Sequence, residues 1–331
     1  MSATDAGEMG SSHIFTGAEQ VREPGKPAHE FVAHFWGVRG SYPVSKANIQ
    51  HTGGNTACVE VRVGGHEIIL DAGTGLIALG QFLRQQPGAA PPTVTILFSH
   101  LHYDHILGLP FFDPLYQPEA TLHLVGRSAG GKSFKEMLCQ AIASPYFPVD
   151  LREAPATCQF YNLEPGDDLE WHPDAPAPQL QSASRDGALV RARTPAPDAV
   201  RVTFLHSAAH PRNGCLISRI EYGGRSLVFA TDVEGPQDGD QALIRFARGA
   251  DVLIHDAQYH EEEYVTSKHG FGHSTPRMAT AVARAAGVKR LVLFHHDPEH
   301  DDGVLEKLHH MAQREFPQTT LATEGLELAL L

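Results

Sequence analysis

The chain has 331 residues, and its 42% hydrophobic content supplies enough apolar material for a globular core. Its 26 Lys and Arg against 39 Asp and Glu give a formal net charge of −13, which argues against a general nucleic-acid binder. No apolar run approaches the roughly 18 residues that span a bilayer, and residues 1–30 contain no signal-peptide core. The four cysteines lack the spacing of a disulfide framework, which is typical of thiols in a reducing compartment. Together these features predict a cytoplasmic protein without membrane association.

The first residues differ in composition from the rest of the chain. Residues 1–28 mix Gly, Ser, Glu and Pro without periodicity and predict a flexible N-terminal tail. A single domain is predicted over residues 29–331. Within it, residues 172–200 are rich in Pro and Ala and predict a surface insertion.

Short apolar runs predict the strands. Two hairpins are expected, each with a Gly-Gly turn: residues 59–63 with 67–70, and residues 216–221 with 227–230. Three continuous apolar runs predict strands buried on both faces, at residues 94–98, 252–254 and 291–294.

The clearest helix is predicted over residues 276–286. Thr275 stands at its N-cap, Pro276 at the first helical position and Gly287 at the C-terminal cap. Further helices are expected at residues 75–85, 134–143 and 303–316. Together the elements predict an α/β fold of the αββα type, in which two stacked mixed β-sheets carry helices on their outer faces.

Histidine and aspartate follow the predicted strands. Of the 21 histidines, several stand where a strand ends, together with aspartates. These strand-end positions are Asp71, the segment 99–105, Asp232, the pair His255 and Asp256, and the triplet 295–297. Because ligand sites in layered α/β folds gather at the carboxyl ends of strands, the pattern predicts one metal centre.

The densest cluster is His100-x-His102-x-Asp104-His105. In an extended loop, residues two apart point the same way, so His100 and His102 can hold one ion together. Asp104 and His105 then face a different direction, which suits a second ion. The alternative is a partly exposed histidine loop without a metal.

At this point the sequence resembles the metallo-β-lactamase fold. The resemblance covers about residues 31–300 and starts from the cluster at 100–105, which follows an apolar strand and precedes Gly108. The segments Thr52-Gly-Gly-Asn-Thr56 and Ile69-Leu-Asp-Ala-Gly-Thr-Gly75 resemble the N-terminal half of that fold. Gly272-His-Ser-Thr275 and Leu293-Phe-His295 resemble its phosphodiesterase branch, which includes tRNase Z and phosphoribosyl cyclic phosphodiesterase.

The resemblance implies a ligand set for two divalent ions. His100, His102 and a later histidine would hold the first ion; Asp104, His105 and His295 would hold the second, with Asp232 bridging both. For the later histidine we favour His210 over His206, because His210-Pro211 with Gly214 is closer to the family's His-Pro-Gly-Gly pattern. In this chain Pro-Arg-Asn-Gly follows His210, which is one residue longer than the Pro-Gly-Gly of the family pattern. Imidazole and carboxylate ligands without thiolate favour zinc, with manganese as the alternative.

The predicted catalytic residues are Asp104 and His273. In the phosphodiesterase branch, the histidine that matches His273 is thought to stabilise transition-state charge or to protonate the leaving oxygen, a task that suits an imidazole. The alternative is a histidine merely exposed before a helix.

Four other residues are expected near the predicted site. Asp71 is expected to fix a ligand imidazole or a loop. Asp256 either does likewise or only caps a strand end. Arg39 either meets a phosphate or lies on the surface, and His296 is expected to pack rather than to bind metal.

The predicted reaction is hydrolysis of a small phosphodiester, of the cyclic phosphate or cyclic nucleotide type, by a metal-bound hydroxide. Nucleic acid is not the expected partner, because residues 160–199 contain seven acidic residues, among them Glu164, Asp167, Asp168, Glu170 and Asp174, against three arginines and no lysine-rich arm. The alternatives are a lactone, thioester or β-lactam hydrolase on the same site, a tRNA 3′-processing endonuclease, and a non-enzymatic metal-binding protein. A homodimer is left open.

Overall fold

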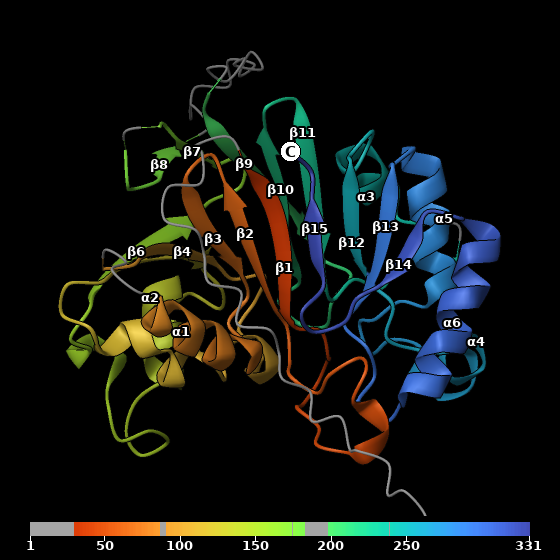
Figure 1. Ribbon diagram of the computed structural model, residues 1–331, viewed down its shortest axis with the longest axis horizontal. Helices are drawn as coiled ribbons and strands as arrows, with labels where there is room; N and C mark the ends of the chain where they lie inside the picture. Colours follow the sequence, from red (N-terminus) through yellow and green to blue (C-terminus); the bar gives the residue numbers. More distant parts are fainter. Residues whose placement is uncertain (1–29, 87–90, 174, 183–197, 238) are drawn as a thin grey trace, which may run out of the picture.

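The structure is a computed structural model that describes residues 30–86, 91–173, 175–182, 198–237 and 239–331. The predicted tail at residues 1–28 lies outside the described residues. Within the described ranges, the strands form two mixed sheets that stack on each other (Figure 1). None of the helices in these ranges has the length and hydrophobicity needed to cross a membrane.

The first sheet has the strand order β15-β1-β2-β3-β4-β5-β6. Strands β3 to β6 are parallel, and the remaining pairs are antiparallel. The predicted hairpin and the predicted buried strand at 94–98 are present as β2, β3 and β4, whereas the sequence patterns did not predict the other four strands. The strands are β1 (Phe31–Gly37), β2 (Cys58–Val63), β3 (His66–Leu70), β4 (Thr93–Leu97), β5 (Thr121–Arg127), β6 (Thr157–Leu163) and β15 (Glu327–Ala329).

The second sheet has the order β14-β13-β12-β11-β10-β9-β7-β8, with β11 to β14 parallel. Strand β8 lies inside the segment predicted as a surface insertion and pairs with β7, so this part of residues 172–200 is a sheet edge; residues 183–197 lie outside the described part. The strands are β7 (Asp168–Trp171), β8 (Gln179–Gln181), β9 (Val200–Ser207), β10 (Cys215–Tyr222), β11 (Arg225–Ala230), β12 (Val252–Asp256), β13 (Arg290–Phe294) and β14 (Thr319–Leu321).

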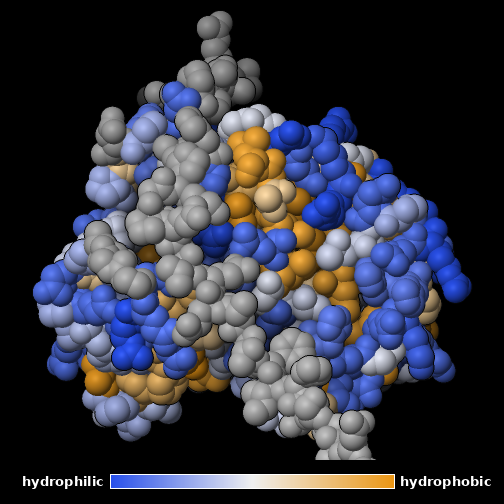
Figure 2. All heavy atoms as spheres, viewed as in Figure 1, coloured by the Kyte–Doolittle hydropathy of each residue, from blue (hydrophilic) through white to orange (hydrophobic). Residues whose placement is uncertain are grey.

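The apolar core forms three layers. Residues such as Phe35, Leu70 and Phe229 fill the space between the sheets. The outer face of the first sheet is covered by helices α1 (Gly75–Gln85) and α2 (Phe134–Ala141) (Figure 1). The outer face of the second sheet is covered by helices α3 (Gln241–Phe246), α5 (Pro276–Ala286) and α6 (Asp302–Glu315). The short helix α4 (Glu261–Glu263) lies near these three. Polar side chains cover α5 and α6, while apolar ones gather toward the middle of the same view (Figure 2). The predicted αββα layering is confirmed.

The helix ends follow the predicted signals closely. On α5, the Thr275 side chain accepts from the Met278 backbone N–H, and Gly287 adopts the left-handed conformation (φ 64°) that ends the helix. The bounds of α1 match the prediction, whereas α2 ends at Ala141 rather than at residue 143. Parallel pairing brings the carboxyl ends of β3 and β4, and of β11 to β13, to one edge of each sheet, and this edge carries the site.

Candidate metal centre

The loop after β4 is tied to both sheets. The Ser99 carbonyl accepts from the Leu216 N–H at the start of β10, and the His105 carbonyl accepts from the Ala72 N–H after β3. Residues 103–105 form a single 3-10 turn that buries Asp104 and His105. The cluster of histidines therefore lies where the two sheets meet.

The structure brings His210, and not His206, to the first two histidines of this loop. The ligand atoms of His100, His102 and His210 lie within 4.8 Å of one another, and His210 Nε2 is 3.1 Å from His102 Nδ1. Burial lowers the pKa of each of these imidazoles, which keeps them neutral and leaves the lone pairs that a metal requires. His206 is exposed and contacts Arg127 instead.

A second cluster contains Asp104, His105 and His295, with its ligand atoms also within 4.8 Å. Asp104 Oδ2 lies 3.2 Å from Nε2 of both histidines. Burial opposes ionisation of Asp104, but the neighbouring His105 and His295 hold its pKa well below the usual range. The carboxylate is therefore charged and available to a cation.

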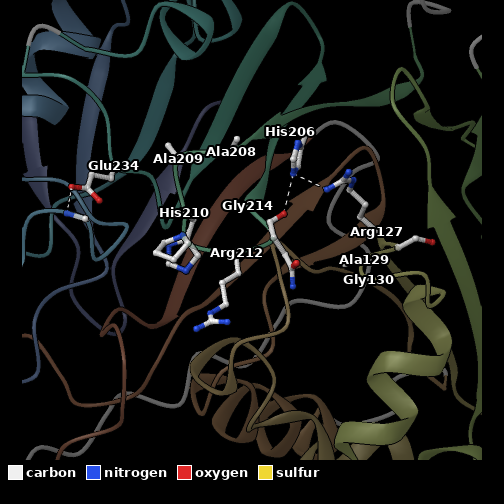
Figure 3. Close-up of a pocket in the computed structure, with 14 residues that line it drawn as sticks. Arg127, Ala129, Gly130, His206, Ala208, Ala209, His210, Arg212, Gly214 and Glu234 are labelled. Atoms are coloured by element: carbon white, nitrogen blue, oxygen red, sulfur yellow. Dashed lines mark hydrogen bonds between the residues drawn. The ribbon is translucent and has the colours of Figure 1, made fainter.

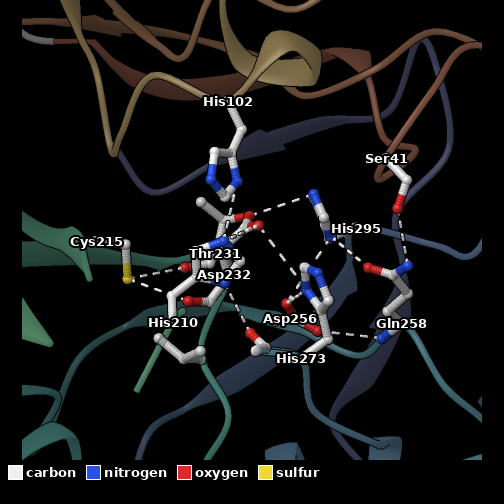
Figure 4. A network of polar contacts seen from close by, with 12 residues as sticks. Ser41, His102, His210, Cys215, Thr231, Asp232, Asp256, Gln258, His273 and His295 are labelled. Atoms are coloured by element: carbon white, nitrogen blue, oxygen red, sulfur yellow. Dashed lines mark hydrogen bonds and ion pairs between the residues drawn. The ribbon is translucent and has the colours of Figure 1, made fainter. Parts of the chain in front are cut away.

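Asp232 lies between the two clusters. Its Oδ2 is 3.1 Å from His105 Nε2, and its Oδ1 is 3.7 Å from His100 Nε2. The same carboxylate lies 3.2 Å from His295 Nε2 through Oδ2 and 3.7 Å from His210 Nε2 through Oδ1 (Figure 4). Burial raises the pKa of this carboxyl, but the surrounding imidazoles lower it well below the ordinary value. One buried carboxylate thus faces imidazoles from both clusters, which is the geometry of a bridging ligand.

Three of these imidazoles are oriented by a hydrogen bond at Nδ1, the ring nitrogen that does not face the centre. In each case Nδ1 faces an acceptor and Nε2 points toward the centre, the arrangement that fixes the tautomer of a metal-binding histidine. The pairs are His105 with Asp71 (2.7 Å), His295 with the Gln258 side-chain oxygen (3.0 Å) and His210 with the Gly272 carbonyl (3.0 Å). The placement of Asp71 agrees with the sequence-based expectation, whereas Gln258 and the Gly272 carbonyl carry no sequence signal.

Backbone strain concentrates at the same strand ends. Asp71 (φ 61°), Asp232 (φ 54°) and His295 (φ 61°) are non-glycine residues in the left-handed region. Each such residue costs on the order of 1–3 kcal/mol and persists only where its surroundings determine the conformation. The strained residues follow β3, β11 and β13, so strain coincides with the candidate centre.

His273 lies between the two clusters and is not the exposed histidine of the alternative reading. Its ring centroid is 5.2 Å from that of His210 and 5.0 Å from that of His295. Its Nδ1 is 2.8 Å from Asp256 Oδ2 (Figure 4). Burial alone would lower its pKa, but Asp256 and further carboxylates raise the pKa of His273 to about 9. Asp256 thus orients His273, and it also accepts the backbone N–H of Ser274.

The donor set fits divalent cations. Within the described residues, Nε2 of His100 is buried and has no hydrogen-bond partner, which is costly unless an ion occupies the space it faces. The site provides buried carboxylates and neutral imidazoles in two adjoining groups, and no thiolate belongs to either. This chemistry suits Zn²⁺ or Mn²⁺.

Arg39 takes neither of the roles considered for it. It is fully buried, and its guanidinium donates to the backbone carbonyls of Gly53, Asp297 and His300, so it neither faces a substrate nor lies on the surface. No sequence pattern predicts the contacts with these carbonyls, because Gly53 lies far along the chain from Asp297 and His300. His296 donates its Nε2–H to the Ala322 carbonyl and is buried, as expected for a packing residue.

A cavity opens beside the candidate centre. It has a volume of about 570 Å³ and is bordered by His210, Arg127, Arg212, His206 and Glu234, among others (Figure 3). A smaller hollow of about 110 Å³ borders His100 and His102. Both are concave spaces next to the histidines, where a substrate can reach them.

Comparison with known proteins places the chain in a family. The family described as "Beta-lactamase superfamily domain" matches residues 66–296. The chain belongs to this superfamily, and the resemblance to the metallo-β-lactamase fold is confirmed. The metallo-β-lactamase fold protein YhfI from Bacillus subtilis superposes with a TM-score of 0.62 at 19% identity, over 91% of this chain and 99% of that one.

Two curated proteins that the chain resembles in sequence are ribonucleases. Ribonuclease Z of Brevibacillus brevis is 41% identical over 107 residues, which cover 30% of this chain and 31% of that protein. Ribonuclease BN of Escherichia coli O1:K1 is 27% identical over 250 residues, which cover 69% of this chain and 79% of that protein. With these relatives, the predicted class is confirmed: the chain is a metal-dependent hydrolase of the metallo-β-lactamase superfamily.

Proposed function

We propose that this protein is a phosphodiesterase that hydrolyses a small phosphodiester, of the cyclic phosphate or cyclic nucleotide type, with two divalent ions. The observation that carries the proposal is Asp232, a buried carboxylate that faces histidines of two adjoining clusters. In this assignment His100, His102 and His210 would hold one ion, Asp104, His105 and His295 would hold the other, and Asp232 would serve both. Zinc is the favoured metal and manganese the alternative.

Two ions in this arrangement would supply Lewis acidity at the phosphoryl oxygens and lower the pKa of water. The remaining steps belong to the chain's own residues. Asp71, Gln258 and the Gly272 carbonyl hold the ligand imidazoles in one orientation, so little reorganisation is needed during the reaction. His273, held by Asp256 through Nδ1, is positioned to donate a proton from its other nitrogen to the leaving oxygen.

The charge distribution supports a small substrate. The net charge of −13 disfavours association with a polyanion, because RNA affinity depends largely on neutralising phosphates. Around β6 and β7 the described residues include the acidic side chains of Glu164, Asp167, Asp168 and Glu170. A cavity of about 570 Å³ suits one nucleotide-sized ligand.

A second candidate is tRNA 3′ processing. The observation that favours it is the similarity to ribonucleases Z and BN, whose names state that they act on RNA. The same metal centre would serve this reaction. The two candidates therefore differ in how the rest of the substrate is bound, and a direct comparison of substrates separates them.

The test is a substrate panel with Zn²⁺ or Mn²⁺ supplied, applied to the wild type and to Asp104→Ala. The panel contains bis(p-nitrophenyl) phosphate, cyclic nucleotides, a cyclic ribose phosphate, a precursor tRNA and a lactone. We expect the small phosphodiesters to be cleaved and the Asp104→Ala variant to lose about 10³-fold in rate, since a metal centre supplies several kcal/mol of transition-state stabilisation.

The matched control is Asp198→Ala, which removes an exposed aspartate outside both clusters and should behave as the wild type. Turnover of the lactone alone, or of precursor tRNA alone, would contradict the proposal. So would phosphodiesterase activity that survives the loss of Asp104.

A further inference from the structure

The segment of residues 39–41 lies against the second cluster, and the proposed reaction does not use it. The segment follows β1 of the first sheet, whereas His295 follows β13 of the second sheet. The Gly40 N–H donates to the His296 carbonyl (3.0 Å), and the His296 N–H donates to the Val38 carbonyl (3.0 Å). These two backbone bonds join the two sheets directly beside His295.

The buried Arg39 fixes the position of this segment. Its Nε donates to the Gly53 carbonyl (2.8 Å), and its Nη1 donates to the carbonyls of Asp297 (3.0 Å) and His300 (2.7 Å). Moving a fully buried guanidinium is costly, because each of these carbonyls would lose its donor. The segment therefore has little freedom to move away from the second cluster.

Gly40 packs its backbone against the His295 imidazole. A β-carbon at residue 40 would lie 2.4 Å from both Nδ1 and Cε1 of His295, and 3.0 Å from the Gln258 side-chain oxygen. Ordinary contact distances between carbon atoms are about 3.5–4.0 Å. The ring has no free space to move into, since His295 is fully buried and its Nδ1 is bonded to Gln258. Only glycine lets the backbone lie this close to the ring.

Ser41 contacts one proposed ligand directly and another through a single side chain. Its backbone N–H donates to Asp104 Oδ2 (2.7 Å), and its hydroxyl oxygen accepts from the Gln258 side-chain nitrogen (3.1 Å). The oxygen of the same Gln258 amide holds His295 Nδ1 (Figure 4). A hydrogen bond to a charged carboxylate is stronger than one between neutral groups, so the Ser41 N–H fixes the orientation of Asp104.

The backbone of Ser41 is strained. Its φ of 63° is left-handed, and the Tyr42 N–H bonds to the Gly40 carbonyl (2.7 Å), which closes a three-residue turn around Ser41. Such a turn is rare for a residue other than glycine. Glycine would adopt this conformation at lower cost, so a serine at this position points to the bond between its hydroxyl and Gln258.

The first cluster has a comparable glycine contact. A β-carbon at Gly272 would lie 2.4 Å from His210 Nδ1, the nitrogen that the Gly272 carbonyl holds. Gly272 is also left-handed (φ 95°) and precedes His273, so a substitution there would have several effects at once. Gly40 is not left-handed, so alanine at residue 40 changes only the space beside His295.

We propose that Gly40 and Ser41 are positioning residues for the second ion, the one assigned to the cluster of Asp104 and His295. They hold these two ligands in the relative placement that the ion requires and thereby set its affinity. This inference rests on the two-ion assignment of the proposed function and deepens it. In the described part of the chain, no hydrogen bond joins Gly40 or Ser41 to the histidines of the first cluster, so the first ion should be unaffected.

The test measures the affinity of the full chain for each Zn²⁺ ion by competition with a chromophoric chelator. We expect Gly40→Ala to weaken the second ion roughly 100-fold, as for loss of a group that orients a ligand, and to leave the first unchanged. Since His210→Ala should remove the first ion, the double variant Gly40→Ala/His210→Ala should bind its one ion with the lowered affinity. The control is Gly303→Ala on α6, where a β-carbon would meet nothing nearer than 3.5 Å.

A second variant separates positioning from folding. Ser41→Gly removes the hydroxyl and relieves the left-handed strain, so the metal-free protein should unfold at a temperature close to that of the wild type. We still expect the second ion to bind roughly tenfold more weakly, because the Gln258 nitrogen loses its acceptor. A merely structural role of Ser41 predicts no loss of metal affinity. If Gly40→Ala does not fold, this variant decides.

Three results would overturn the inference. They are wild-type affinity for both ions in Gly40→Ala and Ser41→Gly, equal weakening of both ions, and a double variant that binds its ion as tightly as His210→Ala alone. Failure of the proposed function is seen separately. A wild type that binds two ions but cleaves no phosphodiester refutes the proposed reaction, while the measured affinities still decide the role of Gly40 and Ser41.

Discussion

The two sheets supply the candidate centre in different ways. The first sheet contributes His100, His102, Asp104 and His105 from one loop, within six consecutive residues after β4. The second sheet contributes single residues from separate places: His210 between β9 and β10, Asp232 after β11, His273 before α5 and His295 after β13. The first half is a local motif, and the second half depends on the tertiary fold.

The groups that hydrogen-bond to the ligand imidazoles and orient them also differ between the two halves. In the first half, the Asp71 carboxylate holds His105, while the neutral Ser99 hydroxyl lies 3.0 Å from Nδ1 of His100. In the second half, neutral oxygens hold the imidazoles: the Gln258 side chain for His295 and the Gly272 carbonyl for His210. Since a carboxylate raises the basicity of its imidazole more than an amide does, the two halves should differ in their sensitivity to loss of these partners.

The largest effect is expected at the residue where the two halves meet. Asp232→Ala removes the carboxylate that faces both clusters, and we expect a loss of about 10³-fold or more in phosphodiesterase kcat together with reduced metal content. Metal analysis and steady-state kinetics measure both quantities. The Asp198→Ala control should match the wild type in each. Two retained ions per chain in Asp232→Ala would contradict the bridging assignment.

Substitution of His273 tests whether this residue of the second half acts on the substrate rather than on a metal. We expect His273→Ala to keep its metal content and to lose about 10²–10⁴-fold in rate with an alkoxide leaving group, because proton donation matters most for a poor leaving group. The loss should be smaller with p-nitrophenolate, which departs without a proton. Equal losses for the two leaving groups would remove His273 from this role.

The contrast between the halves also explains what the sequence could predict. The loop at 100–105 was recognisable because all its ligands share one short spacing, and Asp232 and His295 because each follows a buried apolar strand. Gln258 and the Gly272 carbonyl were missed, since an amide two residues beyond a strand and a backbone oxygen carry no distinctive residue type. The strands β5, β6 and β9 were missed because polar residues interrupt their apolar pattern, and the burial of Arg39 depends on carbonyls from distant loops.

A smaller effect is expected for the groups that orient the ligands, and it should be unequal between the halves. Asp71→Asn keeps the shape and tolerates the left-handed backbone at this position, so it removes mainly the charge. We expect the affinity for one ion to fall roughly 10–100-fold. Gln258→Ala, which removes a neutral acceptor, should cost less. Competition with a chromophoric chelator measures both affinities, and an equal loss in the two variants would abolish the distinction between the halves.

The smallest effect on the metal centre is expected for His206, the alternative to the favoured His210 in the sequence-based ligand set. His206→Ala should leave the number of bound ions unchanged, because this side chain contacts Arg127 at 2.7 Å and belongs to neither cluster. His210→Ala should lose one ion, since its Nε2 lies with His100 and His102 while its Nδ1 is held by the Gly272 carbonyl. Metal analysis of the two variants side by side measures the difference. Loss of an ion in His206→Ala with full occupancy in His210→Ala would reverse the assignment.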